Sequence, residues 1–361
     1  MRKRKKTQQV KVGDIFIGGD APVSIQSMTN IPLEDVEGTI AQIRELEKNG
    51  AEIVRLAVRT EDAAAHLEKI IRAVQIPLTA DIHFNYRIAL AAIKAGIHKV
   101  RINPGNIGEP SRVREVLRAA RDRGIPIRIG VNGGSVDRKK YPEVTPEILV
   151  ESAMEHVHIL EDNNFPDIIV SIKSSDVFHT IEANRLFSSK RDYPLHIGLT
   201  EAGYGTACVV QSSIATGHLL LEGIGDTIRV SMTGDPVEEV LVGRRILESV
   251  GERRALVRMV SCPTCGRTDP SLDLLSLARQ VEQEVTARFS ERLRQSNRSI
   301  TVAVMGCEVN GPGEASEADA GLAGAGKDMV LLFSRGERRA RIPHDQAVRA
   351  LVEELENMIG S

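Results

Sequence analysis

One repeated pattern limits the fold of this chain more than any other feature of its sequence. From Ala21 to about Val250, a short run of β-branched residues is followed by a polar turn and then by an amphipathic stretch of roughly 10 to 18 residues. The predicted strands are Pro22–Met28, Ala51–Val58, Pro77–Phe84, Lys99–Asn103, Pro126–Asn132, Asp167–Ser174, Pro194–Glu201 and Thr227–Thr233. Eight such βα units fit a closed (β/α)8 TIM barrel better than an open sheet, because the number of units and the total length both match.

The pattern changes after Gly251, where a charged linker is followed by a pair of cysteines. The remaining chain predicts a long helix over Leu272–Gln295, a strand over Ile300–Met305, a strand pair around Met329–Ile342 and a final helix. The Ala- and Gly-rich stretch Ala315–Gly326 is expected to be a flexible loop. A chain of 361 residues exceeds the size of one ordinary core. We therefore predict a TIM-barrel domain over residues 1–250 and a smaller α+β domain over residues 251–361.

Composition excludes several classes of partner. With 47 Lys and Arg against 49 Asp and Glu, the net charge is -2, so no broad positive field is present to bind nucleic acid. No stretch has the apolar length of a membrane-spanning helix, and the N-terminus lacks the apolar run of a signal peptide. We expect a cytoplasmic protein with no nucleic-acid or membrane partner, and a basic run at Arg2–Lys6 that is only a solvated tail.

Polar side chains end most of the predicted strands, and barrel enzymes carry their chemistry at these carboxyl ends. The candidates are Arg55, Asp81, His83, Arg101, Asn103, Arg128, Asn132, Lys173, Glu201 and Ser231. Residues two apart in a strand share a face, so Asp81 and His83 point the same way, as do Arg101 and Asn103.

Three arginines and one lysine at one barrel mouth would repel one another unless an anion neutralised them. Arginine binds phosphate oxygens through two N–H groups at once, so the sequence predicts a phosphate or diphosphate ester as ligand. Two alternatives stay open for these cations. Each arginine could instead form an ordinary salt bridge with Asp81 or Glu201, and Lys173 could form a Schiff base.

Three cysteines of the second domain form an incomplete metal-ligand set. Cys262 and Cys265 lie in SCPTCGR, and Cys307 lies in MGCEVNGPGE with Glu314 seven residues beyond it. Structural zinc would need a fourth Cys or His, for which only His344 is available, and a redox dithiol would leave Cys307 without a role. An iron–sulfur cubane with three thiolates and one other ligand is the third possibility. Cys208 is expected to be a buried filler.

Longer motifs identify a family. SIQSMTN, TADIHFNYRIAL, VRINPGNIG, IRIGVNGGS, LTEAG, EGIGDTIRVSMTGDPVEE, SCPTCGR and MGCEVNGPGEA together resemble the 4-hydroxy-3-methylbut-2-en-1-yl diphosphate synthase family of the methylerythritol phosphate route to isoprenoids. The resemblance runs from about Val10 to the C-terminus, and the CxxC and GCxVNGPGE pair is highly specific to this family.

The resemblance implies an iron–sulfur oxidoreductase that opens and reduces 2-C-methyl-D-erythritol 2,4-cyclodiphosphate. It implies a 4Fe-4S cluster held by Cys262, Cys265, Cys307 and Glu314. It places the diphosphate contacts on Arg55, Arg101, Arg128, Asn132, Lys173 and Ser231, beside which we predict His83 and Asn103. Asp81 and Glu201 fall nearest the reacting carbons, and with Glu314 they form the predicted catalytic set. Reduced flavodoxin or ferredoxin is the implied electron donor, and a head-to-tail homodimer is the implied assembly.

Two other functions stay open on the sequence alone. A Schiff-base lyase with a zinc-closed accessory domain would use Lys173 for chemistry and His344 as the fourth ligand. An iron–sulfur sensor would use the barrel only to bind a phosphorylated metabolite.

Overall fold

The computed structural model describes residues 4–136 and 139–360. It divides into two compact units, Met1–Arg253 and Arg254–Ser361. Within the described residues, no helix is both long and apolar enough to cross a membrane.

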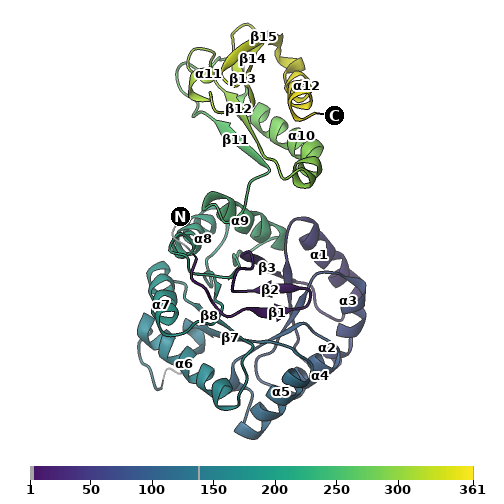
Figure 1. Cartoon of the computed structure of the whole chain (residues 1–361), viewed down its shortest axis with the longest axis vertical. Helices are drawn as coiled ribbons and strands as arrows, with labels where there is room; N and C mark the ends of the chain where they lie inside the picture. The colour runs from purple at the N-terminus through teal and green to yellow at the C-terminus, as the bar shows by residue number, and fades with distance from the viewer. Residues whose placement is uncertain (1–3, 137–138, 361) are drawn as a thin grey trace. The chain divides into compact units, whose positions relative to one another are not determined.

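The first unit is a barrel of eight parallel strands surrounded by helices, as the repeated pattern predicts (Figure 1). The strands are β3 (Ser24–Met28), β4 (Ile53–Ala57), β5 (Leu78–Asp81), β6 (Lys99–Ile102), β7 (Ile127–Asn132), β8 (Ile168–Lys173), β9 (His196–Ile197) and β10 (Thr227–Ile228). Neighbours pair in the order β8-β7-β6-β5-β4-β3-β10-β9. A parallel bridge between Val170 and Leu195 joins β8 to the start of β9 and closes the ring.

The helices follow the strands at the expected positions. They are α1 (Val36–Lys48), α2 (Glu61–Ala65), α3 (Leu67–Ala73), α4 (Tyr86–Lys94), α5 (Pro110–Asp122), α6 (Pro146–Asp162), α7 (Val177–Lys190), α8 (Gly205–Leu221) and α9 (Pro236–Ser249). Side-chain caps set several of the starts: Asp35 accepts a hydrogen bond from the N–H of Gly38, and Asp176 accepts one from that of His179.

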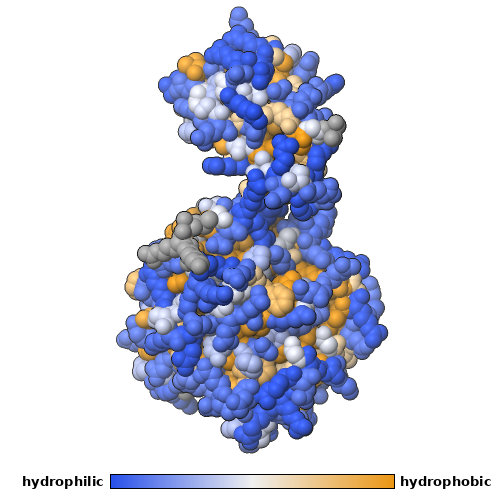
Figure 2. Space-filling model, viewed as in Figure 1, coloured by the Kyte–Doolittle hydropathy of each residue, from blue (hydrophilic) through white to orange (hydrophobic). Residues whose placement is uncertain are grey.

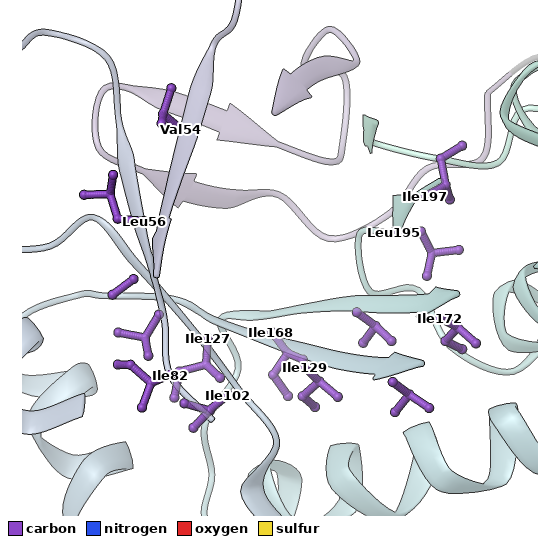
Figure 3. Packing of buried hydrophobic residues seen from close by; sticks show 14 of the residues in the cluster. Val54, Leu56, Ile82, Ile102, Ile127, Ile129, Ile168, Ile172, Leu195 and Ile197 are labelled. Atoms are coloured by element: carbon purple, nitrogen blue, oxygen red, sulfur yellow. The ribbon is translucent and has the colours of Figure 1, made fainter. Parts of the chain in front are cut away.

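Each barrel strand has an apolar face toward the helices and a polar face toward the barrel axis. In β6, Val100 and Ile102 belong to the main hydrophobic core, whereas Lys99 and Arg101 alternate with them and face inward. Figure 3 shows Ile102, Ile127 and Ile129 packed on the helix side of their strands. Because the core lies between strands and helices, the barrel interior is free to carry polar side chains.

A small hairpin closes the amino-terminal end of the barrel. Strands β1 (Val10–Val12) and β2 (Ile15–Ile17) pair antiparallel and lie across the opening (Figure 1). Their buried side chains Val10, Val12 and Ile17 pack against Ile53 of β4 and Ile169 of β8. Apolar residues also gather near the middle of the barrel unit in Figure 2.

The expectation of a solvated basic tail is wrong for Arg4 and Lys5, whereas Lys6 is exposed as expected. Arg2 and Lys3 lie outside the described residues. Arg4 donates a hydrogen bond to the backbone oxygen of Ala21 at 2.7 Å and pairs with buried Asp226 at 3.0 Å. Lys5 pairs with Asp192 at 2.9 Å. Arg4 is held in place because the buried carboxylate of Asp226 requires a cation.

The second unit is a five-stranded sheet with two long helices. The strands β11 (Val257–Ser261), β12 (Ile300–Met305), β13 (Ala320–Gly324), β14 (Met329–Ser334) and β15 (Glu337–Pro343) lie in chain order, the first three parallel and the last two antiparallel. Helices α10 (Leu274–Gln295) and α12 (Ala347–Ile359) share a core with one face of this sheet. The short helix α11 (Gly311–Glu314) contacts β12 and β13.

Within the Ala- and Gly-rich stretch, residues Ala320–Gly324 form the central strand β13, so this part is not the flexible loop that its composition suggests. All five of its residues are buried. A Cβ atom at Gly321 would lie 2.5 Å from the ring of Phe333 and 2.8 Å from the backbone oxygen of Ala303. The strand has small residues because its neighbours leave no space for larger ones.

We expect Gly321→Ala to destabilise the second unit by about 1–3 kcal/mol, the usual result of overpacking a tight core. Urea unfolding measures the effect. Gly313→Ala is the matched control, because a Cβ atom there meets nothing within 4 Å. An equal unfolding midpoint for the two variants would contradict this account of β13.

Candidate functional site

The carboxyl ends of the barrel strands line one strongly cationic pocket. Its walls are formed by Arg55, Arg101, Arg128, Gly130, Asn132, Ser171, Lys173, Thr200, Arg229 and Ser231. The structure thus brings together the six residues that the resemblance places on the diphosphate. It adds Arg229, Ser171, Thr200 and Gly130, which the sequence analysis did not select.

Asp81 lies between two of the arginines. Its carboxylate is 3.6 Å from the Nε of Arg55, 3.3 Å from a terminal nitrogen of Arg101 and 3.6 Å from the Nε2 of His83. Burial acts to raise the pKa of Asp81, but Arg55, His83 and Arg101 together outweigh burial and hold that pKa well below its usual range. Asp81 is therefore ionised at neutral pH, which suits it to orient the two arginines and not to donate a proton.

Arg229 forms the second ion pair of the pocket. It contacts buried Glu239 of α9 at 3.1 Å and 3.3 Å through two of its nitrogens. Glu239 also accepts hydrogen bonds from the backbone of Met232 and the hydroxyl of Ser27. The sequence contains a signal for Arg229, since it lies two positions before Ser231 and so shares its strand face.

Arg128 and Lys173 have no carboxylate partner in the pocket. Arg128 is 2% exposed, and its Nε and one terminal nitrogen have no hydrogen-bond partner among the described residues. Burial, followed by the charges of Arg55 and Arg101, lowers the pKa of Arg128 well below its usual range. Burial, followed by Arg229 and Arg128, does the same for Lys173. Both groups lack the counter-charge that a bound anion would supply.

Two glycines leave space for the cations. A Cβ atom at Gly130 would lie 2.6 Å from the Nε of Arg101, and one at Gly198 would lie 3.0 Å from the Nζ of Lys173. Arg101 also donates a hydrogen bond to the backbone oxygen of Gly130 at 3.0 Å. The glycines therefore determine where the charged groups lie in the mouth.

The other predicted site residues of the barrel lie around the pocket and are not part of its lining. Asn103 accepts a hydrogen bond from the backbone N–H of Gly130 at 3.2 Å, so it supports the pocket from behind. His83 is half-exposed and contacts Arg101 at 3.3 Å. Glu201 is exposed, follows the pocket residue Thr200 and has a left-handed backbone with φ of 55°. The structure does not bring Glu201 into the lining of the pocket.

The charge of the pocket defines its ligand class. Four arginines and one lysine line it, and among the carboxylates of the described residues only Asp81 and Glu239 pair with them. Burial, followed by the charge of Arg229, lowers the pKa of Arg55 to about 10, so Arg55 stays charged at neutral pH. An excess of cations at close range favours a ligand with several negative charges.

The three cysteines of the second unit are free thiols on loops beside one edge of its sheet. Cys262 directly follows β11, and Cys307 follows the parallel neighbour β12 by two residues, so the fold brings both to the same edge. The N–H of Gly306 contacts the Sγ of Cys262 at 3.1 Å. Cys265 is exposed on the loop before α10, and its N–H donates to the hydroxyl of Thr268 at 3.1 Å.

Glu314 ends α11, the short helix that starts after Cys307. The N–H of Gly311 donates to the backbone oxygen of Cys307 at 3.1 Å, which fixes the helix to the cysteine loop. The carboxylate of Glu314 is exposed and accepts a hydrogen bond from Asn310 at 3.3 Å.

The chemistry of this donor set, three free thiols and a carboxylate, is of the kind that iron–sulfur clusters use. Across residues 4–136 and 139–360, no three His, Cys, Asp or Glu side chains lie close enough together to hold one metal ion. A cubane takes one ligand on each iron, so its donors surround the cluster instead of meeting at one point. The backbone N–H and then the charge of Arg267 lower the pKa of Cys265, which favours the thiolate that a metal needs.

Comparisons with known proteins assign the chain to a family. A family model described as the GcpE TIM-barrel domain matches residues 7–244, and one described as the GcpE protein C-terminal domain matches residues 258–357. A protein of Clostridium acetobutylicum named 4-hydroxy-3-methylbut-2-en-1-yl diphosphate synthase (flavodoxin) is 52% identical over 358 residues, which cover 98% of this chain and 99% of the relative. A relative with the same name from Ruminiclostridium cellulolyticum is 51% identical and covers 99% of both chains.

Solved structures support the barrel fold alone. Dihydropteroate synthase from Stenotrophomonas maltophilia superposes with a TM-score of 0.51 at 14% identity, over 68% of this chain and 99% of that one. The synthase from Yersinia pestis gives a TM-score of 0.50 at 11% identity, over 68% of this chain and 100% of that one. The predicted fold class is confirmed, and because the two family models match the barrel and the second unit in turn, the chain belongs to the GcpE family.

Proposed function

We propose that this protein converts 2-C-methyl-D-erythritol 2,4-cyclodiphosphate into (E)-4-hydroxy-3-methylbut-2-enyl diphosphate by reductive ring opening and dehydration. Reduced flavodoxin or ferredoxin would supply the two electrons, through a 4Fe-4S cluster. The observation that carries the proposal is the pocket of four arginines and one lysine, in a chain whose relatives are named for a diphosphate product and for flavodoxin. Because the reaction needs a low-potential donor and free thiolates, we place it in the cytoplasm.

The barrel residues would hold the part of the substrate that does not react. Arg128 and Lys173, which lack carboxylate partners, would take the most direct contacts with phosphate oxygens, while Arg55 and Arg101 are oriented by Asp81. Asn132 and Ser231 add neutral donors to the lining. Binding energy from the diphosphate can then be used to position the carbon skeleton. Glu201 is exposed beside the barrel mouth. It remains a predicted catalytic residue whose carboxyl group would lie near the reacting carbons of the substrate.

The second unit would hold the cluster through Cys262, Cys265, Cys307 and Glu314. When bound, such a cluster supplies low-potential electrons and, at a corner without a thiolate, a Lewis-acidic iron. Glu314 suits that corner because a carboxylate is a harder and more exchangeable donor than a thiolate. The N–H of Gly306 on Cys262 is a contact of the kind that tunes cluster potential.

The direct test is turnover by anaerobically reconstituted protein. With the cyclic diphosphate and reduced methyl viologen, we expect formation of the linear enyl diphosphate, detected by phosphorus NMR. Reconstituted protein with full iron content and no product would refute the proposed activity.

For the cation pocket, we expect Arg128→Met to raise the KM for the cyclic diphosphate roughly 10- to 100-fold, because hydrogen bonds to charged groups contribute about 1.5–3 kcal/mol. The iron content should not change, since Arg128 is in the barrel. Arg118→Met, an exposed position on α5, is the control. A KM equal to that of the wild type would show that Arg128 does not contact substrate.

For the cluster ligands, Cys307→Ala should abolish iron binding, whereas Cys208→Ala should retain about four irons per chain. Cys208 is a fair control because it is buried in the barrel unit and far in sequence from the other thiols. Iron and sulfide assays with visible absorption give the readout. Full iron content in Cys307→Ala would remove that residue from the ligand set.

We also propose that the protein is a homodimer, and the outer face of α8 supports this. Val210, Ile214 and Leu221 are each about half-exposed on this helix, and Leu241 of α9 is 37% exposed. The groove between the two helices is lined mostly by apolar side chains. Exposed apolar surface of this kind is typical of protein interfaces.

Ile214→Glu should shift the protein from dimer to monomer in light scattering after size exclusion, since a carboxylate at the centre of an apolar interface is left unpaired. Arg118→Glu on α5 should leave the mass unchanged. A monomeric wild type, or a dimeric Ile214→Glu variant, would exclude this face as the interface.

A further inference from the structure

One cation of the barrel interior lies below the pocket and is not part of its lining. Lys99 of β6 is 0% exposed. Its Nζ has one hydrogen bond, to the side-chain oxygen of Gln26 at 3.3 Å. Among the described residues, no carboxylate forms an ion pair with it. Burial, followed by the charges of Arg128 and Arg55, lowers the pKa of Lys99 well below its usual range. A fully buried lysine with only an amide as partner is unusual, because such charges are normally paired.

The groups around Lys99 are also incompletely satisfied. Thr79 lies opposite it on β5, and the Oγ1 of Thr79 has no hydrogen-bond partner among the described residues. The same is true of the Nε2 of Gln26 and of two nitrogens of Arg128. These polar atoms are all buried, so within the described residues Lys99 is accompanied by buried polar groups that have no hydrogen-bond partner.

The position of this layer connects it to the pocket. Arg101 lies two residues beyond Lys99 on the same strand face and lines the pocket. Lys99 is therefore one layer deeper on the barrel axis, under the place where a polyanion would bind. At the effective dielectric of a protein interior, about 20, a unit charge still acts strongly over about 10 Å.

We propose that Lys99 is an affinity-determining residue for the diphosphate, acting through its charge from the layer beneath the pocket. In the free protein, burial and the neighbouring arginines oppose the charge of Lys99. A polyanion bound above it would favour that charge and be attracted by it. Arg55, Arg101, Arg128, Lys173 and Arg229 make the direct contacts, whereas Lys99 adds to the positive potential that they share. This inference rests on the proposed function, because it requires a diphosphate at the mouth.

Two variants test it independently. Lys99→Met removes the charge while keeping most of the side-chain volume, and Gln26→Glu keeps Lys99 but places a carboxylate beside it. Both should raise the thermal midpoint of the ligand-free protein, because Lys99→Met removes the unpaired buried amine and Gln26→Glu gives it a carboxylate partner. Both should also lower the affinity for inorganic diphosphate, measured by calorimetric titration, by about tenfold. This is the size of effect expected from one unit charge at this distance. In turnover, KM for the cyclic diphosphate should rise with kcat little changed.

Lys94→Met, which removes an exposed lysine at the end of α4, is the matched control and should behave as the wild type. Wild-type diphosphate affinity in either Lys99→Met or Gln26→Glu would overturn the inference, and so would a lower thermal midpoint in both. A wild-type protein that binds no diphosphate at all would instead count against the proposed function. If Lys99→Met does not fold, the diphosphate affinity and thermal midpoint of Gln26→Glu test the inference on their own.

Discussion

The repulsion among buried cations at the barrel mouth is the interaction on which the site depends. One pocket is lined by Arg55, Arg101, Arg128, Lys173 and Arg229. In the part of the chain that the structure describes, only Asp81 and Glu239 form ion pairs with these cations. Folding must stabilise this arrangement through packing elsewhere, and the large core between strands and helices provides that stabilisation. The cations of the free protein are therefore already positioned to bind an anion with several charges, and a diphosphate ester is such an anion.

The alternation of side chains along parallel strands makes such a site possible. Because each strand places its apolar residues against the helices, the inward positions are free for charged ones, as Lys99 and Arg101 show between Val100 and Ile102. The same principle operates in the second unit. There the parallel pair β11 and β12 brings Cys262 and Cys307 to one edge, although the two residues lie 45 positions apart. Both candidate sites thus lie at the carboxyl ends of parallel strands.

Much of this was predictable from the sequence, because period-two and helical patterns specify the elements and the strand ends. The predictions that were wrong or incomplete have physical explanations. Arg229 lies within the predicted strand Thr227–Thr233 and was missed because the selection took only residues late in each strand, and Arg229 comes two positions before Ser231. Ala315–Gly326 was misread because small residues occur in flexible loops and also in tightly packed strands, and only the approach of Phe333 to Gly321 distinguishes the two. The order of Arg4 depends on Asp226, more than 200 positions away in sequence.

The central claim is that the diphosphate of the substrate binds among the unpaired cations of the mouth. A crystal structure of the anaerobic protein soaked with the cyclic diphosphate tests it most directly. We expect phosphate oxygens within hydrogen-bond distance of Arg128 and Lys173, with Asp81 still between Arg55 and Arg101. Diphosphate density outside the barrel mouth, or density in the mouth with Arg128 and Lys173 turned away from it, would contradict the account.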